Sequence, residues 1–150
     1  MIKYQVLFLE FFIFLSLRAD DYPNSPSGAP TITVGGASKN GRIEISGDED
    51  LFKVTLTGGV SYTVVNQAAS GSDPEIYVRG PSPSTTQIAY NDDHDELSAQ
   101  VIFTAPTSGT YFIVSAGYKA TTGPYSLRIF LTIPCPTNCG RNQFHSLKNF

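Results

Sequence analysis

The chain of 150 residues contains no tryptophan, a single methionine and only two cysteines, Cys135 and Cys139. A disulfide between these neighbours would close a small loop in an exported protein, but it would not staple a larger core. Basic residues form no patch, and the net charge of −3 with a pI near 5.2 argues against a nucleic-acid partner. No helical hydrophobic period is present from residue 31 onward, so the main domain is expected to contain no helix.

The first 19 residues differ in character from the rest. Lys3 precedes a short apolar run over residues 6–15, and Leu17-Arg18-Ala19 follows with a small residue last. This order is typical of a secretory signal peptide, and the run is shorter than the roughly 20 residues that a bilayer-spanning helix needs. Glu10 interrupts the run, so an uncleaved anchor or a misread start codon are the alternatives. We expect residues 1–19 to direct export to the extracellular space or cell surface, with no stable membrane span.

Residues 20–133 carry the period-two pattern of short strands separated by turn residues. Nine strands are marked by Ile32 and Val34, Ile43 and Ile45, Phe52 to Leu56, Tyr62 and Val64, Ile76 and Val78, Gln87 to Tyr90, Val101 and Phe103, Tyr111 to Ala116, and Tyr125 to Leu131. The segment Tyr111 to Ala116 is apolar on both faces, so its register is left open. We predict an all-β, jelly-roll-like antiparallel sandwich of about eight to nine strands, followed by an irregular tail over residues 134–150.

Acidic residues gather at one end of this sandwich if successive strands alternate in direction. Of the 13 acidic residues, 11 then share one pole, and only Glu10 and Glu44 do not. The segments expected at this acidic pole are Asp20-Asp21, Gly47–Asp50, Ser72–Glu75, Asn91–Glu96 and Gly117–Gly123. The loops of the opposite pole contain no acidic residue.

The densest group of carboxylates, Asp48 to Asp50, follows Gly47 and leads directly into the apolar residue Phe52. Carboxylates packed this closely repel one another unless water or a counter-charge neutralises them. Hard oxygen ligands on adjoining loops are what Ca²⁺ selects, but Asp, Asn and Gly also form ordinary solvated turns. No EF-hand spacing is present, so the spacing alone leaves both a Ca²⁺ site and a solvated corner open.

Seven short motifs occur in a characteristic order. They are Asp21-Tyr22-Pro23-Asn24-Ser25, Gly41-x-Ile43, Gly47-Asp48-x-Asp50-x-Phe52, Asn91-Asp92-Asp93, Phe103-Thr104-Ala105, Gly109-Thr110-Tyr111 and Gly123-x-Tyr125-x-Leu127. Together they resemble the bacterial pre-peptidase C-terminal domain over about residues 20–132. The resemblance implies a β-sandwich module appended to secreted proteases and other exported enzymes, with the fold of the collagen-binding domains of clostridial collagenases.

In those collagen-binding relatives, Ca²⁺ is held between the N-terminal segment and the aspartate corner. Carried over by position, the resemblance implies as ligands Asp21, Asn24, Asp48 and Asp50, with Asp20 and the Leu51 carbonyl as further candidates. Three departures from the family pattern accompany these matches. Leu51 stands where an aromatic residue is usual, Ser27-Gly28-Ala29 replaces a Thr-Ala pair, and His94-Asp95-Glu96 replaces a glycine-rich loop.

No sequence motif frames a catalytic nucleophile, since Gly-x-Ser-x-Gly is missing. His94 lies among acidic residues and is interpreted as a solvated turn residue, with a hydrolase that uses it as the remote alternative. We therefore expect a non-catalytic module that binds an extracellular protein or polysaccharide, or assists the export of a linked peptidase. Tyr77 and Tyr118 are candidates for a contact face. The alternative is a structural or adhesive surface domain that has no specific ligand.

Overall fold

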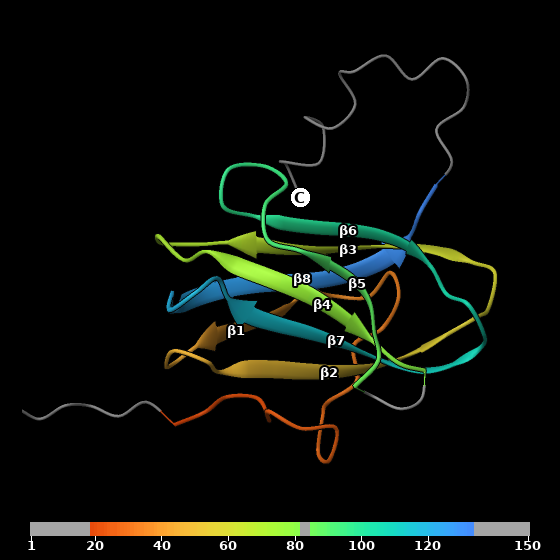
Figure 1. The fold of residues 1–150 in the computed structure, drawn as a ribbon, viewed down its shortest axis with the longest axis horizontal. Coiled ribbons are helices and arrows are strands. Elements are labelled where there is room, and N and C mark those ends of the chain that lie inside the picture. Colours follow the sequence, from red (N-terminus) through yellow and green to blue (C-terminus); the bar gives the residue numbers. More distant parts are fainter. Residues whose placement is uncertain (1–18, 82–84, 134–150) are drawn as a thin grey trace, which may run out of the picture.

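A computed structural model describes residues 19–81 and 85–133 of the chain, and the expected signal segment before residue 19, the tail and both cysteines lie outside these residues. The described residues form eight strands and no helix (Figure 1). The strands are β1 (Lys39–Ile43), β2 (Glu49–Leu56), β3 (Ser61–Ala68), β4 (Pro74–Arg79), β5 (Gln87–Asn91), β6 (Ala99–Thr104), β7 (Gly109–Gly117) and β8 (Gly123–Leu131). In this part of the chain, no helix long and apolar enough to cross a membrane is found.

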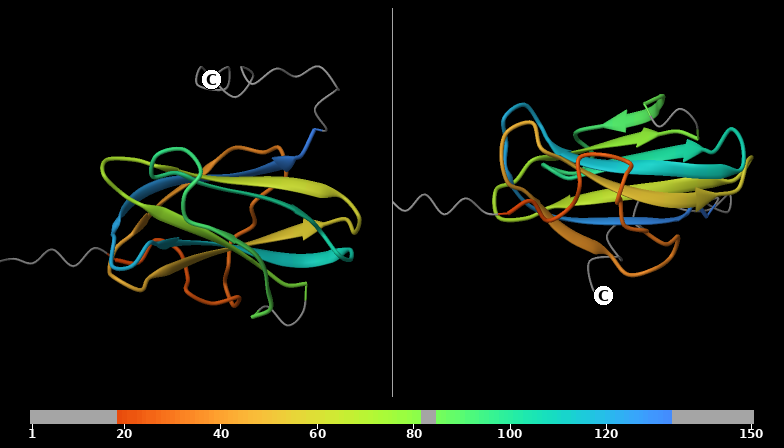
Figure 2. Two further views of the ribbon diagram at one scale, coloured as in Figure 1. Left: turned by 45° about the horizontal axis from the view of Figure 1, so that its top comes forward. Right: turned by 90° about the horizontal axis from the view of Figure 1, so that it is seen from below.

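Two four-stranded antiparallel sheets pack face to face, as Figure 2 shows from two sides. The first sheet has the order β1-β8-β3-β6 and the second has the order β2-β7-β4-β5. This arrangement confirms the predicted all-β antiparallel sandwich.

The period-two pattern places alternate side chains in the core between the sheets. In β2, Phe52, Val54 and Leu56 are buried, whereas Lys53 and Thr55 are exposed. The segment with two apolar faces is β7, which lies inside the second sheet and pairs with both β2 and β4. Its inner residues join the main core. Its outer residues Phe112 and Val114 pack with Leu51 and Ala29 in a second, smaller apolar cluster.

Ala29 belongs to an N-terminal segment, residues 20–34, that runs beside β2 (Figure 1). The amide of Leu51 donates to the carbonyl of Pro23 at 3.2 Å, and that of Lys53 donates to the carbonyl of Pro30 at 2.9 Å. The strand predicted around Ile32 and Val34 is wrong, since this region forms only an isolated parallel bridge between Thr31 and Lys53. Three prolines at positions 23, 26 and 30 lack the N–H groups that a regular ladder requires.

Strand directions alternate along the chain, so the loops after β1, β3, β5 and β7 lie at the same end of the sandwich. The acidic pole is therefore present as predicted. Glu44 also lies there, contrary to the prediction, because β1 ends at Ile43 and Glu44 begins the corner. All 12 acidic residues of the described chain, which exclude only Glu10, fall in this half of the molecule.

Candidate metal centre

Asp50 is the most deeply buried carboxylate, with 0% of its surface exposed. It lies near the start of β2 and faces the first sheet, where the hydroxyl of Tyr125 donates a 2.6 Å hydrogen bond to Oδ2. Its second oxygen, Oδ1, is buried and has no hydrogen-bond partner among the described residues. Burial, followed by the nearby charges of Asp21, Asp48 and Glu44, raises the pKa of Asp50 to about 8, against the lowering effect of the Tyr125 hydrogen bond.

Gly41 makes room for the Tyr125 hydroxyl. The two residues are directly opposite each other in the β1–β8 ladder, and a Cβ at position 41 would overlap the phenol of Tyr125. The same Cβ would approach the ring of Tyr22 to 2.9 Å. Tyr22 packs against Phe52 with ring centroids 4.6 Å apart, and its hydroxyl donates to the carbonyl of Asn40. The N-terminal segment is thus anchored beside Asp50 by an aromatic contact that depends on a glycine.

Five carboxylates, which we call the acidic cluster, surround this position: Asp20, Asp21, Glu44, Asp48 and Asp50. Oxygens of Asp20, Asp48 and Asp50 lie within 4.8 Å of one another, and so do oxygens of Asp20, Asp21 and Glu44. Asp20 therefore bridges the two groups. Two members come from the N-terminal segment and three from the β1–β2 corner, so the cluster joins segments that are separate in sequence.

Hydrogen bonds within the corner hold these carboxylates in place. Asp48, which is 4% exposed, accepts the amide of Glu44 at 3.1 Å through Oδ2. Asp20 accepts the amide of Tyr22 at 3.1 Å, which turns the N-terminal segment at its start. Burial is the first cause that raises the pKa of Glu44 to about 7, and a hydrogen bond with Asp48 adds to it. Burial also raises the pKa of Asp21.

No cationic side chain of the described residues forms an ion pair with the acidic cluster. In residues 19–81 and 85–133, the one ion pair joins Arg79 to Glu49, which lies outside the cluster. Buried carboxylates without a counter-charge must either hold protons or bind a cation. A donor set made only of oxygen atoms suits a hard cation such as Ca²⁺. Oδ1 of Asp50 and Oε2 of Glu44 are the two buried oxygens of the acidic cluster that have no hydrogen-bond partner among the described residues.

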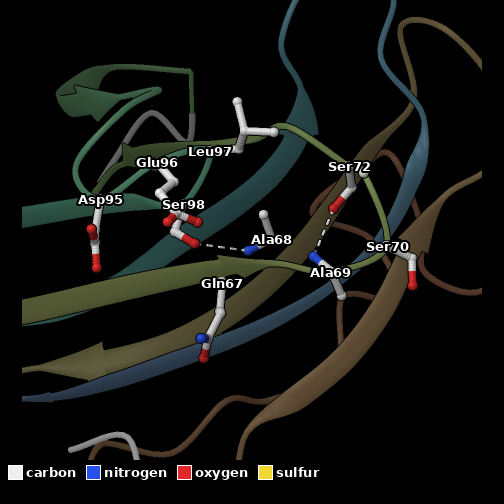
Figure 3. Close-up of a pocket in the computed structure, with 10 residues that line it drawn as sticks. Gln67, Ala68, Ala69, Ser70, Ser72, Asp95, Glu96, Leu97 and Ser98 are labelled. Atoms are coloured by element: carbon white, nitrogen blue, oxygen red, sulfur yellow. Dashed lines mark hydrogen bonds between the residues drawn. The ribbon is translucent and has the colours of Figure 1, made fainter.

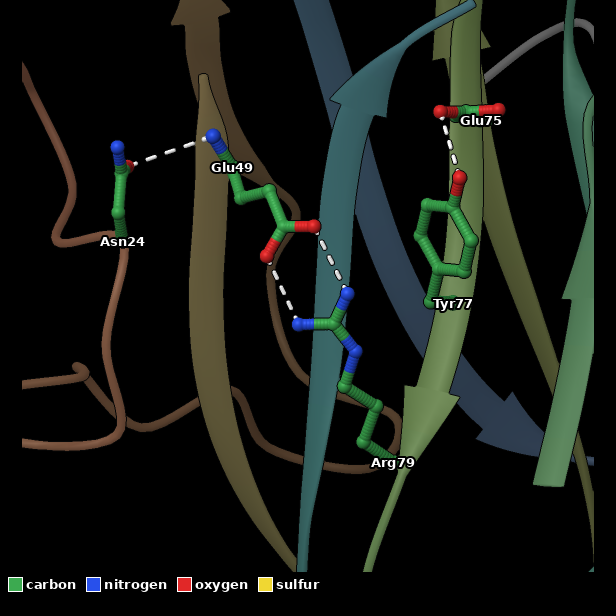
Figure 4. A network of polar contacts seen from close by, with 5 residues as sticks. All are labelled: Asn24, Glu49, Glu75, Tyr77 and Arg79. Carbon is green, nitrogen blue, oxygen red and sulfur yellow. Dashed lines mark hydrogen bonds and ion pairs between the residues drawn. The ribbon is translucent and has the colours of Figure 1, made fainter. Parts of the chain in front are cut away.

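The residues predicted as ligands lie in the N-terminal segment and around the start of β2. Asp21, Asp48 and Asp50, with the less secure Asp20, are brought together in the acidic cluster. Asn24 lies beside β2, where its Oδ1 accepts the amide of Glu49 at 3.4 Å (Figure 4). Leu51 follows Asp50, and its amide donates to Pro23.

Glu44 is the cluster member that the sequence interpretation missed. Glu44 precedes Asp48 by four residues, with Gly47 between them. This spacing would have indicated a shared corner if the strand marked by Ile43 and Ile45 had been predicted to end at Ile43.

The loop that departs from the family pattern forms a shallow hollow with the β3–β4 loop (Figure 3). The hollow has a volume of about 260 Å³ and is lined by residues 67–72 and 95–98. Ser72 donates to the carbonyl of Pro124 at 2.6 Å, and Ser98 accepts the amide of Ala68 at 3.1 Å. These hydroxyl groups fasten the two loops to the strands. His94 stays exposed, and its amide donates to the carbonyl of Ser98 in the turn.

A second polar network lies on the outer face of the second sheet (Figure 4). The buried carboxylate of Glu75 accepts the hydroxyl of Tyr77 at 2.8 Å and that of Tyr90 at 3.0 Å. The two rings lie 4.9 Å apart, and the guanidinium of Arg79 sits 5.3 Å from the Tyr77 centroid. Arg79 in turn makes two 2.8 Å hydrogen bonds to Glu49. Tyr77, Arg79 and Tyr90 form what we call the tyrosine surface.

Burial, with the Glu75 hydrogen bond second, raises the pKa of Tyr77 to about 12, so this hydroxyl remains a donor at neutral pH. Tyr118, the other tyrosine predicted for a contact face, lies in the loop after β7 beneath the ammonium of Lys119. The tyrosine that contacts Tyr77 is therefore Tyr90 rather than Tyr118.

Comparison with known proteins gives one family and one shared fold. Residues 48–117 match the family model of the bacterial pre-peptidase C-terminal domain, which confirms the resemblance predicted from the sequence motifs. The pre-peptidase C-terminal domain of a Bacillus anthracis collagenase is similar in structure, with a TM-score of 0.58 and 19% identity, over 71% of this chain and 99% of that chain. A search of curated protein sequences gives no match.

A periplasmic inhibitor of g-type lysozyme, PliG of Aeromonas hydrophila, is also similar in structure. Its TM-score is 0.51 at 20% identity, over 69% of this chain and 97% of that chain. At these identities both structures establish a common fold and nothing finer.

Proposed function

We propose, from the match of residues 48–117 to the family model of the bacterial pre-peptidase C-terminal domain, that this protein is a secreted, non-catalytic binding module stabilised by Ca²⁺. Domains of this family are peptidase-associated modules. The observation that carries the proposal is the fully buried Asp50, whose Oδ1 has no partner and whose neighbours are four further carboxylates. The ion binds in the acidic cluster, and the tyrosine surface binds an extracellular protein.

The ion replaces the protons that the acidic cluster would otherwise hold. The proposed direct ligands are Asp20, Asp48 and Asp50, whose oxygens lie within 4.8 Å of one another, while Asp21 and Glu44 add negative charge beside them. Backbone carbonyls and waters complete the roughly six to eight oxygen ligands that Ca²⁺ takes. Since the ligands come from the N-terminal segment and the β1–β2 corner, binding also fastens that segment along the free edge of β2.

The tyrosine surface supports a binding role more strongly than a purely structural one. Glu75 fixes both hydroxyl groups and Glu49 fixes the guanidinium, so the three side chains lose little conformational entropy when a partner binds. Tyrosine and arginine are also the residues enriched at the energetic centres of protein interfaces. Tyr90 is 41% exposed, which leaves part of its ring available for contact.

A pull-down tests the binding role. The full chain is incubated with insoluble collagen, because the similar Bacillus anthracis domain belongs to a collagenase, and in parallel with insoluble polysaccharides. We expect retention on the protein polymer that Tyr90→Ala abolishes and Tyr118→Ala preserves, since Tyr118 lies outside the tyrosine surface. Retention on polysaccharide alone would reassign the ligand class. Absence of retention on every polymer, with Ca²⁺-dependent stability intact, would favour a structural or adhesive surface domain.

A further inference from the structure

The sandwich has four edge strands, and three of them are protected against pairing with another chain. The N-terminal segment covers β2, and β1 carries Lys39 and Arg42. A register shift between Val78 and Arg79 interrupts the pairing of β4 with the edge strand β5. Covering segments, charges and irregular pairing are the usual means by which proteins prevent edge-to-edge association.

Within residues 19–81 and 85–133, none of these devices is found at the fourth edge strand, β6. Its sequence, Ala99–Thr104, contains no charged residue, no proline and no glycine, and its register with β3 is unbroken. Val101 and Phe103 face the core, while Gln100, Ile102 and Thr104 face outward. Ile102 is 60% exposed in the middle of the strand. An open, regular and uncharged edge of this kind favours strand addition.

The same three outward residues present their backbone groups to the open edge. The amide of Ala105 donates to the carbonyl of Val60, toward β3. Backbone groups alternate in direction along a strand, so the N–H and C=O groups of Phe103 and Val101 also point toward β3. The N–H and C=O groups of Gln100, Ile102 and Thr104 therefore point away from it.

We propose that β6 pairs in antiparallel register with β6 of a second copy of this chain, with Ile102 opposite Ile102 of the partner copy. The outward pattern Gln-Ile-Thr reads polar, apolar, polar in both directions. A two-fold axis at position 102 therefore places Ile102 opposite Ile102 of the partner copy and Gln100 opposite Thr104 of the partner copy. In this register Gln100, Ile102 and Thr104 each form a hydrogen-bonded pair with the residue opposite. The three pairs give about six backbone hydrogen bonds and join the two copies of the first sheet.

The self-complementary pattern is what selects a second copy over an unrelated extended peptide. A six-residue edge buries less than the roughly 1,200 Å² typical of stable complexes, so the dimer is expected to be weak. The acidic cluster lies on the β1–β2 side of the sandwich, so this association is independent of Ca²⁺.

Sedimentation of the full chain at increasing concentration, combined with amide hydrogen exchange, tests the proposal. We expect a monomer–dimer equilibrium in which the amides of Gln100, Ile102 and Thr104 gain protection with concentration while those of Val101 and Phe103 do not change. Ile102→Lys should remove the dimer by placing two like charges opposite each other. Gln100→Pro removes an outward N–H that makes no bond within the monomer, and it should have the same effect.

The matched control is Ile133→Lys, which makes the same exchange at a residue that is 84% exposed and lies beyond the end of β8. This variant should dimerise like the parent chain. A monomer at all concentrations would overturn the proposal. A dimer that survives both β6 substitutions, or that protects a different set of amides, would overturn it as well.

Discussion

The hydroxyl of Tyr125 donates a 2.6 Å hydrogen bond to Oδ2 of Asp50 and thereby connects β8 of the first sheet to β2 of the second. The bond is buried, and the residues are 75 positions apart in sequence. It satisfies one oxygen of Asp50, whereas the other, Oδ1, has no hydrogen-bond partner among the described residues. The position of the candidate metal centre therefore depends on how the two sheets pack.

Tyr125→Phe tests the importance of this hydrogen bond. A bond to a charged acceptor contributes about 1.5–3 kcal/mol, so the variant should lose that free energy of unfolding in saturating Ca²⁺, as measured by urea denaturation. Tyr62→Phe is the control, because the Tyr62 hydroxyl accepts the neutral amide of Thr57 and should contribute only about 1 kcal/mol. Equal losses in the two variants would argue against an ionised Asp50 at this position.

Gly41→Ala should destabilise the protein by about 1–3 kcal/mol through overpacking, because its Cβ overlaps the Tyr125 phenol. The cost should be smaller in a Tyr125→Phe background, where the hydroxyl is removed. A double-mutant cycle on thermal or urea unfolding measures this coupling. Strict additivity would show that Gly41 is required for another reason.

Metal-free protein should become less stable as the pH rises from about 5 to about 8. The pKa values of Asp50 and Glu44 are raised to about 8 and about 7 in the folded state. The folded protein therefore keeps protons that the unfolded chain has already released, and this stabilisation is lost as the pH passes through the raised values. The proposed Ca²⁺ ion requires the ionised forms, so the increase in Tm on adding Ca²⁺ should be larger at about pH 8 than at about pH 5.5.

The control for this pH dependence is Asp50→Asn, whose Tm in EDTA should vary less with pH than that of the parent chain. The same slope in both proteins would assign the pH dependence to other groups.

Phe52→Ala separates core packing from metal binding. Phe52 is fully buried and packs against Tyr22, so its truncation should cost about 3–5 kcal/mol. Most of this loss should persist in EDTA, where no metal is bound, when chemical denaturation curves in EDTA and in Ca²⁺ are compared. A loss seen only in Ca²⁺ would mean that Phe52 acts mainly through the metal centre.

The acidic pole could be predicted from sequence because hairpin-like connections force successive strands to alternate in direction. The prediction held even though one expected strand is missing. The N-terminal segment runs parallel to β2, in the direction assigned to that strand, so it still carries Asp20 and Asp21 to the correct end. The prolines at positions 23, 26 and 30 were the unused signal that this segment forms no regular ladder.

The internal arrangement of the cluster could not be predicted in the same way. The contact between Tyr125 and Asp50 depends on the β1–β8 register and on the spacing between sheets, neither of which the alternation of apolar residues determines. Asn24, implied as a ligand by its position in the family, accepts the amide of Glu49 through Oδ1, a contact that the sequence pattern does not indicate. Glu44 joins the cluster because β1 ends two residues earlier than its apolar pattern indicates.

Titration calorimetry of Ca²⁺ into the EDTA-stripped full chain at about pH 8, where the raised pKa values favour ionised carboxylates, tests the central claim most directly. We predict saturable binding that Asp50→Asn abolishes and that Asp73→Asn, a change at the same pole outside the acidic cluster, preserves. Absence of binding heat together with an unchanged Tm in Ca²⁺ and EDTA would contradict the account.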